Sequence, residues 1–252
     1  MRSSTKIVVA GVGQRYRLPR MKVRGYGQYC PIAKAAAILS ERWTLLILRD
    51  LLIRGARRYN EFRRGMPLIP PSVLAQRLKT LQQAKIVVRQ SSANGRSWEY
   101  RLTEAGKELR PLIEAAGHWG QRWLGNLLTR DELNPSVLMW DIRRKLKCEE
   151  LPADRTVIYV EFTDVKRMQS WWLVVEEGNA DLCLEDPGHE IDVAIYADLL
   201  SLTRVFLGNL SISRALSEGK IKVSGRRPLT RSISRWFGVS MFAGDNPRPA
   251  TG

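Results

Sequence analysis

Two kinds of hydrophobic spacing follow one another in the first half of the chain. Leucines recur at helical spacing at Leu74, Leu78 and Leu81, and the next segment alternates apolar and polar residues on both sides of Asn94-Gly95. A period near 3.6 residues predicts a helix with one buried face, whereas alternation around Asn-Gly predicts a β-hairpin. We therefore expect a short helix that leads directly into a hairpin within residues 70–102.

Further helices are expected before this unit. Residues 31–39 are rich in alanine and start with a proline, which suits the first turn of a helix. Ser40 can cap a second, strongly apolar helix that ends near Gly55, and residues 57–64 give a short helix. Ser72 is then placed to cap the helix with the leucine stripe.

The element order of the front half is specific. Thr103 begins one or two further helices after the hairpin. The resulting order is helix, helix, short helix, turn, helix, hairpin, helix, which is the order of a winged helix-turn-helix. In that fold the polar side of the second helix of the motif enters a DNA major groove, and the hairpin lies beside it.

The second half predicts a sheet with helices. Residues 131–147 form a helix, and residues 155–162, 169–186 and 190–198 are rich in β-branched and aromatic residues. A turn at residues 177–179 divides the second of these segments, so the strands suggest an antiparallel meander. Helix, a short strand and a last helix follow up to residue 238, and the fold class is therefore α+β.

Charge divides the chain in the same way. Of the net charge of +16, residues 1–24 contribute +7, residues 25–125 contribute +10 and residues 126–252 contribute −1. A basic front half and a neutral back half indicate a polyanion-binding part and a part with another role. Nucleic acid is the expected polyanion, because no amphipathic helix in the front half combines a lysine-rich face with a broad apolar face.

Several classes of protein are disfavoured by the composition. No apolar run approaches the roughly 18–20 residues of a membrane span, and the first residues lack a secretory cleavage site. Three cysteines without paired spacing indicate a reducing, cytoplasmic environment. Neither the cysteines nor His118 and His189 have metal-ligand or nucleophile–base spacing, so we expect no enzyme activity, no metal and no cofactor.

Several short motifs lie within about residues 26–124. They are Cys30-Pro31, Arg42-Trp43-Thr44-Leu45-Leu46, Arg58-Tyr59-Asn60-Glu61-Phe62, Leu74-Ala75-Gln76-Arg77-Leu78 and Glu99-Tyr100-Arg101-Leu102-Thr103. In this order they resemble one family, the HxlR-type winged helix-turn-helix transcription regulators. The family usually has glycine and lysine before the tryptophan at position 43, where this chain has Glu41-Arg42.

The resemblance implies a cytoplasmic homodimer that binds double-stranded operator DNA, each subunit reading half of an inverted repeat. It points to Ser72, Gln76 and Arg77 as base-edge or phosphate contacts and to Arg96 as the wing-tip contact. The alternative for each residue is an ordinary solvated side chain. Other candidates on or beside this surface are Val73 and Thr80, with Arg57, Arg58 and Lys79 as contacts to phosphate.

In the back half, Gly208, Ala215 and the Gly219–Gly225 segment follow the predicted strands. With these strands they resemble a sterol-carrier-protein-like domain over about residues 135–238. The resemblance implies a tunnel for an apolar or lipid-like molecule. Ordinary core packing is the alternative for each residue that we expect in the pocket wall, namely Trp171, Trp172, Phe206, Leu210 and Leu216.

Cys30 has two interpretations. Some HxlR-type regulators sense oxidants or electrophiles through a cysteine just before the first helix, and Cys30 occupies that position. A helix N-terminus favours the thiolate. The alternative is an inert, buried thiol, because free cysteines are commonly buried.

These observations give a leading hypothesis and two alternatives. The first is a dimeric transcription regulator that responds to an apolar effector or a redox signal. The second is a lipid-binding or transfer module tethered by a basic domain, and the third is a regulator whose back half only dimerises. The expected organisation is a basic arm, disordered or a start artefact (1–24), a winged helix-turn-helix domain (25–128), a ligand-binding domain (129–240) and a tail (241–252).

Overall fold

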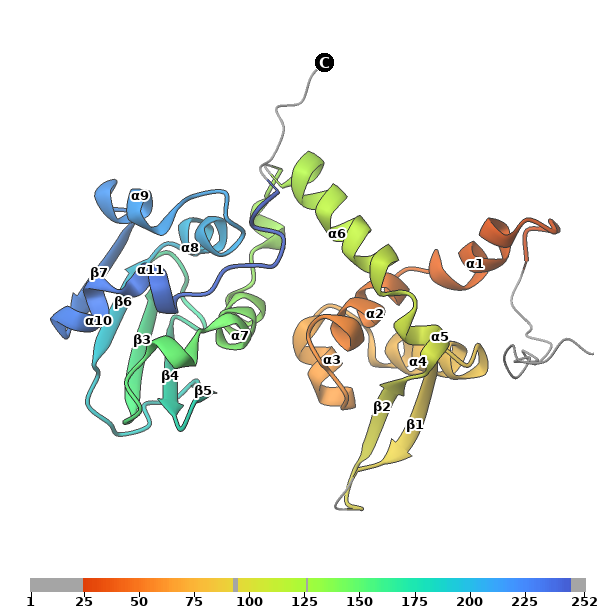
Figure 1. Cartoon of the computed structure of the whole chain (residues 1–252), viewed down its shortest axis with the longest axis horizontal. Helices are drawn as coiled ribbons and strands as arrows, with labels where there is room; N and C mark the ends of the chain where they lie inside the picture. The colour runs from red at the N-terminus through yellow and green to blue at the C-terminus, as the bar shows by residue number, and fades with distance from the viewer. Residues whose placement is uncertain (1–24, 93–94, 126, 246–252) are drawn as a thin grey trace, which may run out of the picture.

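The computed structural model describes residues 25–92, 95–125 and 127–245. It has two lobes, which we call the front domain and the back domain (Figure 1). The expected basic arm (1–24), Asn94 of the hairpin turn and residues 246–252 lie outside the described residues.

The front domain consists of helices and one hairpin. Strand β1 pairs antiparallel with β2, so that Val87 lies opposite Leu102 and Ser91 lies opposite Trp98. The elements follow in the order α1 (Pro31–Leu39), α2 (Thr44–Leu52), α3 (Tyr59–Gly65), α4 (Pro71–Gln83), β1 (Val87–Ser91), β2 (Trp98–Leu102), α5 (Glu104–Lys107) and α6 (Arg110–Leu124).

Helix α2 is the centre of the front domain. Its Ile47 and Leu48 are fully buried, and they belong to the same core as Phe62 of α3 and the leucine stripe of α4. The winged helix-turn-helix predicted from the sequence is thus confirmed, with α3 and α4 as the two helices of the motif and β1–β2 as the wing.

Two predicted helix caps are wrong. Ser40 ends α1, where its hydroxyl donates to the Ala36 carbonyl at 2.6 Å, and α2 begins only at Thr44. Helix α4 begins at Pro71, so Ser72 lies inside its first turn and makes no cap hydrogen bond. Proline is favoured at the first helical position, because its missing N–H and fixed φ cost nothing there.

The back domain combines a five-stranded sheet with helices. Its strand order is β5-β4-β3-β6-β7. The elements follow in the order α7 (Pro135–Lys145), β3 (Thr156–Phe162), β4 (Ser170–Glu176), β5 (Asn179–Cys183), β6 (Val193–Ala197), α8 (Leu199–Phe206), α9 (Ile212–Ser217), β7 (Ile221–Gly225), α10 (Arg227–Arg231) and α11 (Ile233–Trp236), with single 3-10 turns at Arg130–Glu132 and Cys148–Glu150.

The sheet is mixed, and the predicted antiparallel meander is wrong for one strand. Strands β3, β4 and β5 do form a meander, but β6 pairs with β3 in parallel, with Ile158 opposite Val193. Once β4 has taken one edge of β3, the chain crosses to the other edge and runs in the same direction. Alternation along a strand predicts which face is buried but not which neighbour it pairs with.

Ion pairs and hydrogen bonds join the two domains. Arg54, just after α2, forms an ion pair with Asp141 of α7. The Gln121 side chain of α6 donates to Asn209 Oδ1 at 2.6 Å, and Asn209 donates to the Gly125 carbonyl at 2.7 Å. These bonds fix α6 against the loop after α8.

The first part of the expected tail (241–252) packs on helix α6. The Phe242 ring packs edge-on against His118 of α6, with 5.2 Å between ring centroids. The Asp245 carboxylate forms ion pairs with both His118 and Arg122. Residues 241–245 are therefore part of the fold, because one aromatic ring and one carboxylate find complementary partners on α6. No helix among the described residues is both long and apolar enough to cross a membrane.

Candidate nucleic-acid interface

Helix α4 has one buried and one open face. Leu74, Leu78 and Leu81 are buried in the front core. Ser72, Gln76, Lys79 and Gln83 are exposed. Successive helical residues are about 100° apart, so these four side chains lie on the side opposite the leucines. Nothing in the described part of the chain covers this open face.

The flanks of α4 are less accessible. Val73 and Thr80 are half-buried, and the Thr80 hydroxyl donates to the Gln76 carbonyl at 3.1 Å. Their positions place them beside the open face rather than on it. The structure therefore brings Ser72, Gln76 and Lys79 together and leaves these two residues at the margin.

Arg77 is engaged within the protein. Only 17% of its side chain is exposed, and its guanidinium lies 2.5 Å from the Glu41 carboxylate. Its Nε donates to the Arg42 carbonyl at 3.2 Å. The two residues that replace the usual glycine and lysine of the resembled family thus hold Arg77. In this arrangement Arg77 ties α4 to the loop between α1 and α2, and its guanidinium is not presented on the open face.

Arginines also gather where α3 begins. Arg57 and Arg58 are exposed, and their backbone N–H groups both donate to the Glu61 carboxylate, at 2.6 and 3.0 Å. The Arg57 carbonyl accepts from Tyr100 N–H of the wing at 2.7 Å. This hydrogen bond fixes the base of the wing beside α3, so the two arginines lie between the motif and the wing.

The wing carries a cationic and aromatic surface. Arg96 is exposed near its tip. Arg89 of β1 stacks on Trp98 of β2, with 4.4 Å from the guanidinium carbon to the ring centroid, and both side chains are exposed. This pair was not among the residues expected from the sequence. Its signal was present in the alternation of the two strands, which puts both residues on one side of the hairpin.

Cys30 lies directly before α1, at the capping position of that helix. It is half-buried, and its carbonyl accepts from Lys34 N–H at 3.1 Å. Its thiol is thus placed at the positive end of a nine-residue helix and keeps some contact with solvent. Among the described residues no group of three potential metal ligands comes together.

Sequence comparison accounts for the front domain. The family model described as HxlR-like helix-turn-helix matches residues 38–127. The transcriptional regulator YvaP of Bacillus subtilis is 35% identical over 99 residues, which cover 38% of this chain and 91% of YvaP. The chain belongs to the HxlR-like helix-turn-helix family.

Other HxlR-like relatives match the same part of the chain. The regulator YodB of Bacillus subtilis is 33% identical over 96 residues, which cover 37% of this chain and 85% of YodB. A regulator of Mycobacterium tuberculosis is 37% identical over 94 residues but is covered over only 58% of its length. The solved structure of quinone-bound YodB is 34% identical and covers 36% of this chain and 98% of that one, with a TM-score of 0.31. All the curated relatives named here are transcriptional regulators by name.

The back domain of this HxlR-like protein matches a second family model, the SCP-2 sterol transfer family, over residues 146–237. The sterol-carrier-protein-like resemblance is thereby confirmed. This part of the chain carries the strands β3 to β7 and the helices α8 to α11.

Four of the five residues expected to line an apolar pocket in the back domain share one hydrophobic core, namely Trp171, Phe206, Leu210 and Leu216. Trp171 is 1% exposed in the core, and its indole donates to the Met168 carbonyl at 2.7 Å. Trp172 lies on the opposite face of the sheet, next to Tyr159, because consecutive strand residues point to opposite faces. Leu210 and Leu216 pack against the core from its margin. Trp172 is therefore separated from the other four expected residues.

Phe206 lines a different cavity, which lies between the two domains. This cavity has a volume of about 480 Å³. Its apolar wall is formed by Ile53, Phe206, Leu207, Met241 and Phe242, and Arg49, Arg54, Asp141, Arg144 and Lys145 form the polar side. The sequence alone could not reveal this cavity, since its walls come from four segments of the chain, at residues 49–55, 141–145, 206–207 and 240–242.

Proposed function

We propose that this protein is a DNA-binding transcription regulator that acts in the cytoplasm as a homodimer and responds to a small apolar molecule. The observation that carries the proposal is the open polar face of α4, which lies opposite a buried leucine stripe and beside a basic wing. A helix presented in this way fits the major groove of B-form DNA.

The exposed residues suggest separate roles in DNA binding. The Gln76 amide can donate to and accept from one adenine edge, which gives base discrimination. Lys79, Arg57 and Arg58 are suited to phosphate, and Arg96 is suited to the backbone or minor groove beside the wing. Arg77, held by Glu41, acts by positioning α4. Ser72 lies at the N-terminal end of the open face, where a short hydroxyl side chain allows close approach.

The experiment uses duplexes that the wild-type protein selects from a random-sequence pool. Gln76→Ala should lower affinity for the selected duplex about 10- to 100-fold and hardly change affinity for a scrambled duplex, because only a base contact is lost. Lys79→Ala should weaken binding to both duplexes alike, because a phosphate contact is lost. The slope of the logarithm of the binding constant against the logarithm of the salt concentration should fall in magnitude by about one. Fluorescence anisotropy titrations at several salt concentrations measure both effects.

Lys222→Ala is the matched control for these variants. Lys222 is an exposed lysine of β7 in the back domain, so its removal changes the net charge equally and leaves the proposed interface intact. Equal affinities for selected and scrambled duplexes in the wild-type protein would contradict the proposal. A loss of DNA affinity in Lys222→Ala as large as that in Lys79→Ala would contradict it as well.

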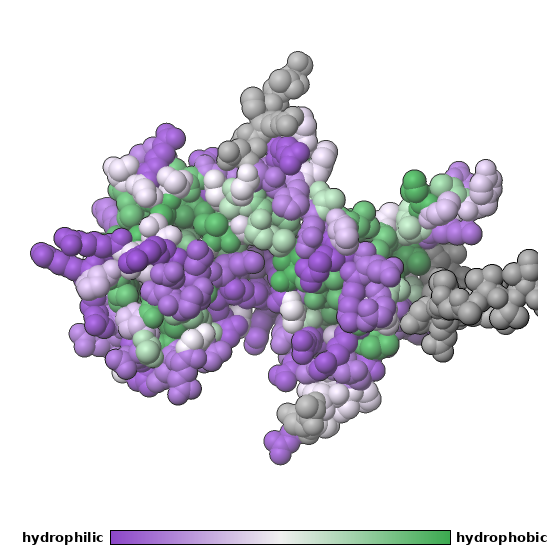
Figure 2. Space-filling view, viewed as in Figure 1, coloured by the Kyte–Doolittle hydropathy of each residue, from purple (hydrophilic) through white to green (hydrophobic). Residues whose placement is uncertain are grey.

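The dimer is proposed from exposed apolar side chains on the outer helices. In α6, Leu112, Trp119 and Trp123 recur at helical spacing and are 42–57% exposed, and Ile32 of α1 is 78% exposed. Figure 2 shows hydrophobic surface over α1 as well. Rows of large exposed apolar residues are typical of interaction surfaces. A two-fold dimer through them presents two copies of α4 to the two halves of an inverted repeat.

The effector site is proposed for the cavity between the domains, where Phe206 and Phe242 form the apolar wall. A ligand that binds one arrangement of the domains more tightly than another shifts the population toward that arrangement. Because α2 and α7 both contribute to the walls, such a shift reaches the DNA-binding motif directly. Cys30, at the capping position of α1, is the proposed site of a redox response.

A neutral fluorescent probe, N-phenyl-1-naphthylamine, tests the apolar site. We expect saturable binding by the wild-type protein and at least about tenfold weaker binding by Met241→Glu, because a carboxylate would have to lose its hydration in the cavity. Met168→Glu is the control, since Met168 is similarly exposed in the back domain and does not line the cavity. Equal probe binding by the two variants would place the apolar site elsewhere.

A further inference from the structure

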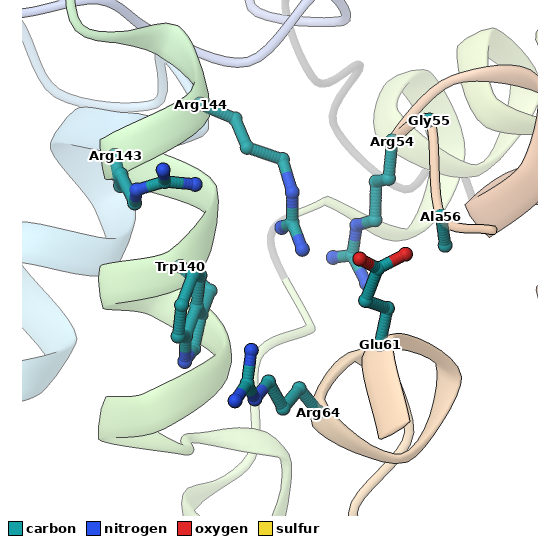
Figure 3. Close-up of a pocket in the computed structure, with 8 residues that line it drawn as sticks. All are labelled: Arg54, Gly55, Ala56, Glu61, Arg64, Trp140, Arg143 and Arg144. Atoms are coloured by element: carbon teal, nitrogen blue, oxygen red, sulfur yellow. The ribbon is translucent and has the colours of Figure 1, made fainter. Parts of the chain in front are cut away.

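A second cavity between the domains is lined by arginines. It has a volume of about 360 Å³ and adjoins the apolar cavity, with which it shares Arg54, Gly55 and Arg144. Figure 3 shows side chains from both domains directed toward it. We call it the arginine cleft. It is lined by Arg54, Gly55, Ala56, Glu61 and Arg64 of the front domain and by Trp140, Arg143 and Arg144 of the back domain.

Acidic groups already compensate part of the positive charge of the arginines in the cleft. Arg54 and Arg144 share the Asp141 carboxylate, with 2.8 Å between Arg144 and Asp141. The Glu61 carboxylate accepts the two backbone N–H groups at the start of α3. Burial is the main cause that lowers the pKa of Arg144, and the nearby Arg54 lowers that pKa further. Positive charge is therefore crowded on this side of the cleft.

The remaining positive charge lies on Arg64 and Arg143. Arg64 forms no ion pair within the described part of the chain, and its guanidinium lies 4.7 Å from the centre of the Trp140 ring. Arg143 lies 5.3 Å from the same ring, and its Nε donates to the Ala180 carbonyl at 2.6 Å. Its ion pair to Asp181 is long, at 3.5 Å, with Asp181 84% exposed. An exposed pair of this kind compensates little charge.

One aromatic ring thus brings together two guanidinium groups from different domains. The two distances to the ring keep the guanidinium carbons within about 10 Å of each other. Like charges at this separation repel each other, and a ring face offsets only part of that repulsion. An anion bound in the cleft that both arginines line can accept charge-assisted hydrogen bonds from them and offset the repulsion.

We propose that the arginine cleft binds a small-molecule anion with two or more negative charges on a compact group, a phosphate group or a dicarboxylate. The size of the cleft is at the lower end of the range for ligand pockets, which fits a compact ligand. The planar fork of a guanidinium group can donate two hydrogen bonds to two oxygens of either kind of anion. The ligand would connect α3, the first helix of the DNA-binding motif, to α7 of the back domain.

Binding itself does not depend on the proposed function, but its consequence does. An anion that bridges α3 and α7 favours the arrangement in which the two domains are docked. If the protein is a DNA-binding regulator, the ligand therefore changes operator affinity. The two claims need separate measurements.

Isothermal titration calorimetry on the full chain tests the site, with inorganic phosphate in one arm and succinate in the other, at matched ionic strength set by sodium chloride. We expect saturable binding of at least one probe. Arg64→Gln and Arg143→Gln should each weaken it about tenfold or more, because each removes one charge-assisted contact. The stronger probe identifies the class of anion. Circular dichroism checks that both variants are folded.

Arg63→Gln is the matched control, because Arg63 is the neighbouring exposed arginine of α3 and does not line the cleft. Its affinity for the probe should stay within about twofold of wild type. Equal losses in Arg63→Gln and Arg64→Gln would mean diffuse attraction to a basic protein and would overturn the proposal. Absence of saturable binding of both probes would overturn it as well.

The DNA arm separates this proposal from the proposed function. We expect phosphate or succinate to change operator affinity in wild type and not in Arg64→Gln at the same ionic strength. Anion binding without this effect would support the binding site but contradict its regulatory role. If Arg64→Gln weakens DNA binding and no probe binds to wild type, the cleft holds a DNA phosphate instead. If no sequence-specific DNA binding were detected, the proposed function would be contradicted. The calorimetry would still test the anion site on its own.

Discussion

Leu78→Ala is expected to lower the free energy of unfolding of the front domain by about 2–5 kcal/mol. Leu78 is 1% exposed and lies in the middle of the leucine stripe that seats α4 on the core formed with Ile47 and Phe62. Truncation loses the transfer free energy of the removed atoms and leaves a cavity between packed helices. Urea unfolding followed by circular dichroism measures the change.

Lys79→Ala is the control for this prediction. The two residues are adjacent, but Lys79 lies on the open face. Its replacement should change the free energy of unfolding by no more than about 0.5 kcal/mol, whereas it weakens DNA binding. Comparing the two variants distinguishes the two faces of α4. The buried face stabilises the fold, and the open face makes the proposed DNA contact. A Leu78→Ala protein as stable as Lys79→Ala would contradict the packing of α4 described here.

Asp50→Ala should destabilise the protein by about 3–5 kcal/mol, because it leaves buried positive charge without its partner. The Asp50 side chain is 1% exposed and accepts from Arg49 Nε at 2.9 Å and from Arg54 at 3.2 Å. Burial is the main cause that lowers the pKa of Arg49, and Asp50 opposes that effect most strongly. Thermal and urea unfolding of the full chain measure the loss.

Glu114→Ala is the comparison for Asp50→Ala. Glu114 forms an ion pair of 3.2 Å with Arg110 on the surface of α6, one helical turn away. Such exposed pairs contribute about 0–1 kcal/mol, since water screens them and both side chains lose conformational freedom. A loss in Asp50→Ala no greater than that in Glu114→Ala would mean that the arginines around Asp50 are solvated in solution.

Asp50 also explains a local requirement for glycine. A β-carbon at Gly65 would lie 2.1 Å from an oxygen of the Asp50 carboxylate, and the Gly65 carbonyl accepts from both Arg49 and Arg54, at 3.3 Å each. The end of α3 is therefore packed directly on the buried ion cluster. The sequence predicted a short helix over residues 57–64, but it did not predict this packing of Gly65.

Much of the fold could be predicted because helices and strands leave local periods in the sequence. The leucine stripe of α4 and the alternation in β1 and β2 gave the order of elements that defines the winged helix-turn-helix. The helix–strand–helix segment around Gly219–Gly225 likewise led to the sterol-carrier-protein-like domain. Helix starts were less well predicted: serines at 40 and 72 looked like caps, but prolines and a left-handed Trp43 set where α2 and α4 begin.

The candidate site was predicted in outline only. Sequence placed Ser72, Gln76 and Lys79 on a polar face, because burial of the leucines fixes the rotation of the helix. It did not reveal that Arg77 turns toward Glu41, since that contact joins residues 36 positions apart. The expected pocket was wrong at Trp172 for a different, local reason, because the alternation of a strand separates consecutive residues. Trp171 and Trp172 are both large and apolar, but strand geometry sends them to opposite faces.

The sequence by itself determined the two domain types, the concentration of positive charge in the first half and the free face of α4, because each depends on composition or on spacing between near neighbours. Only the tertiary structure decided the parallel pairing of β6, the packing of residues 241–245 on α6 and the joining of Arg54, Asp141 and Arg144 between the domains. These features bring together groups that are distant along the chain. Their energies depend on distance and burial in space, which no local pattern of residue types records.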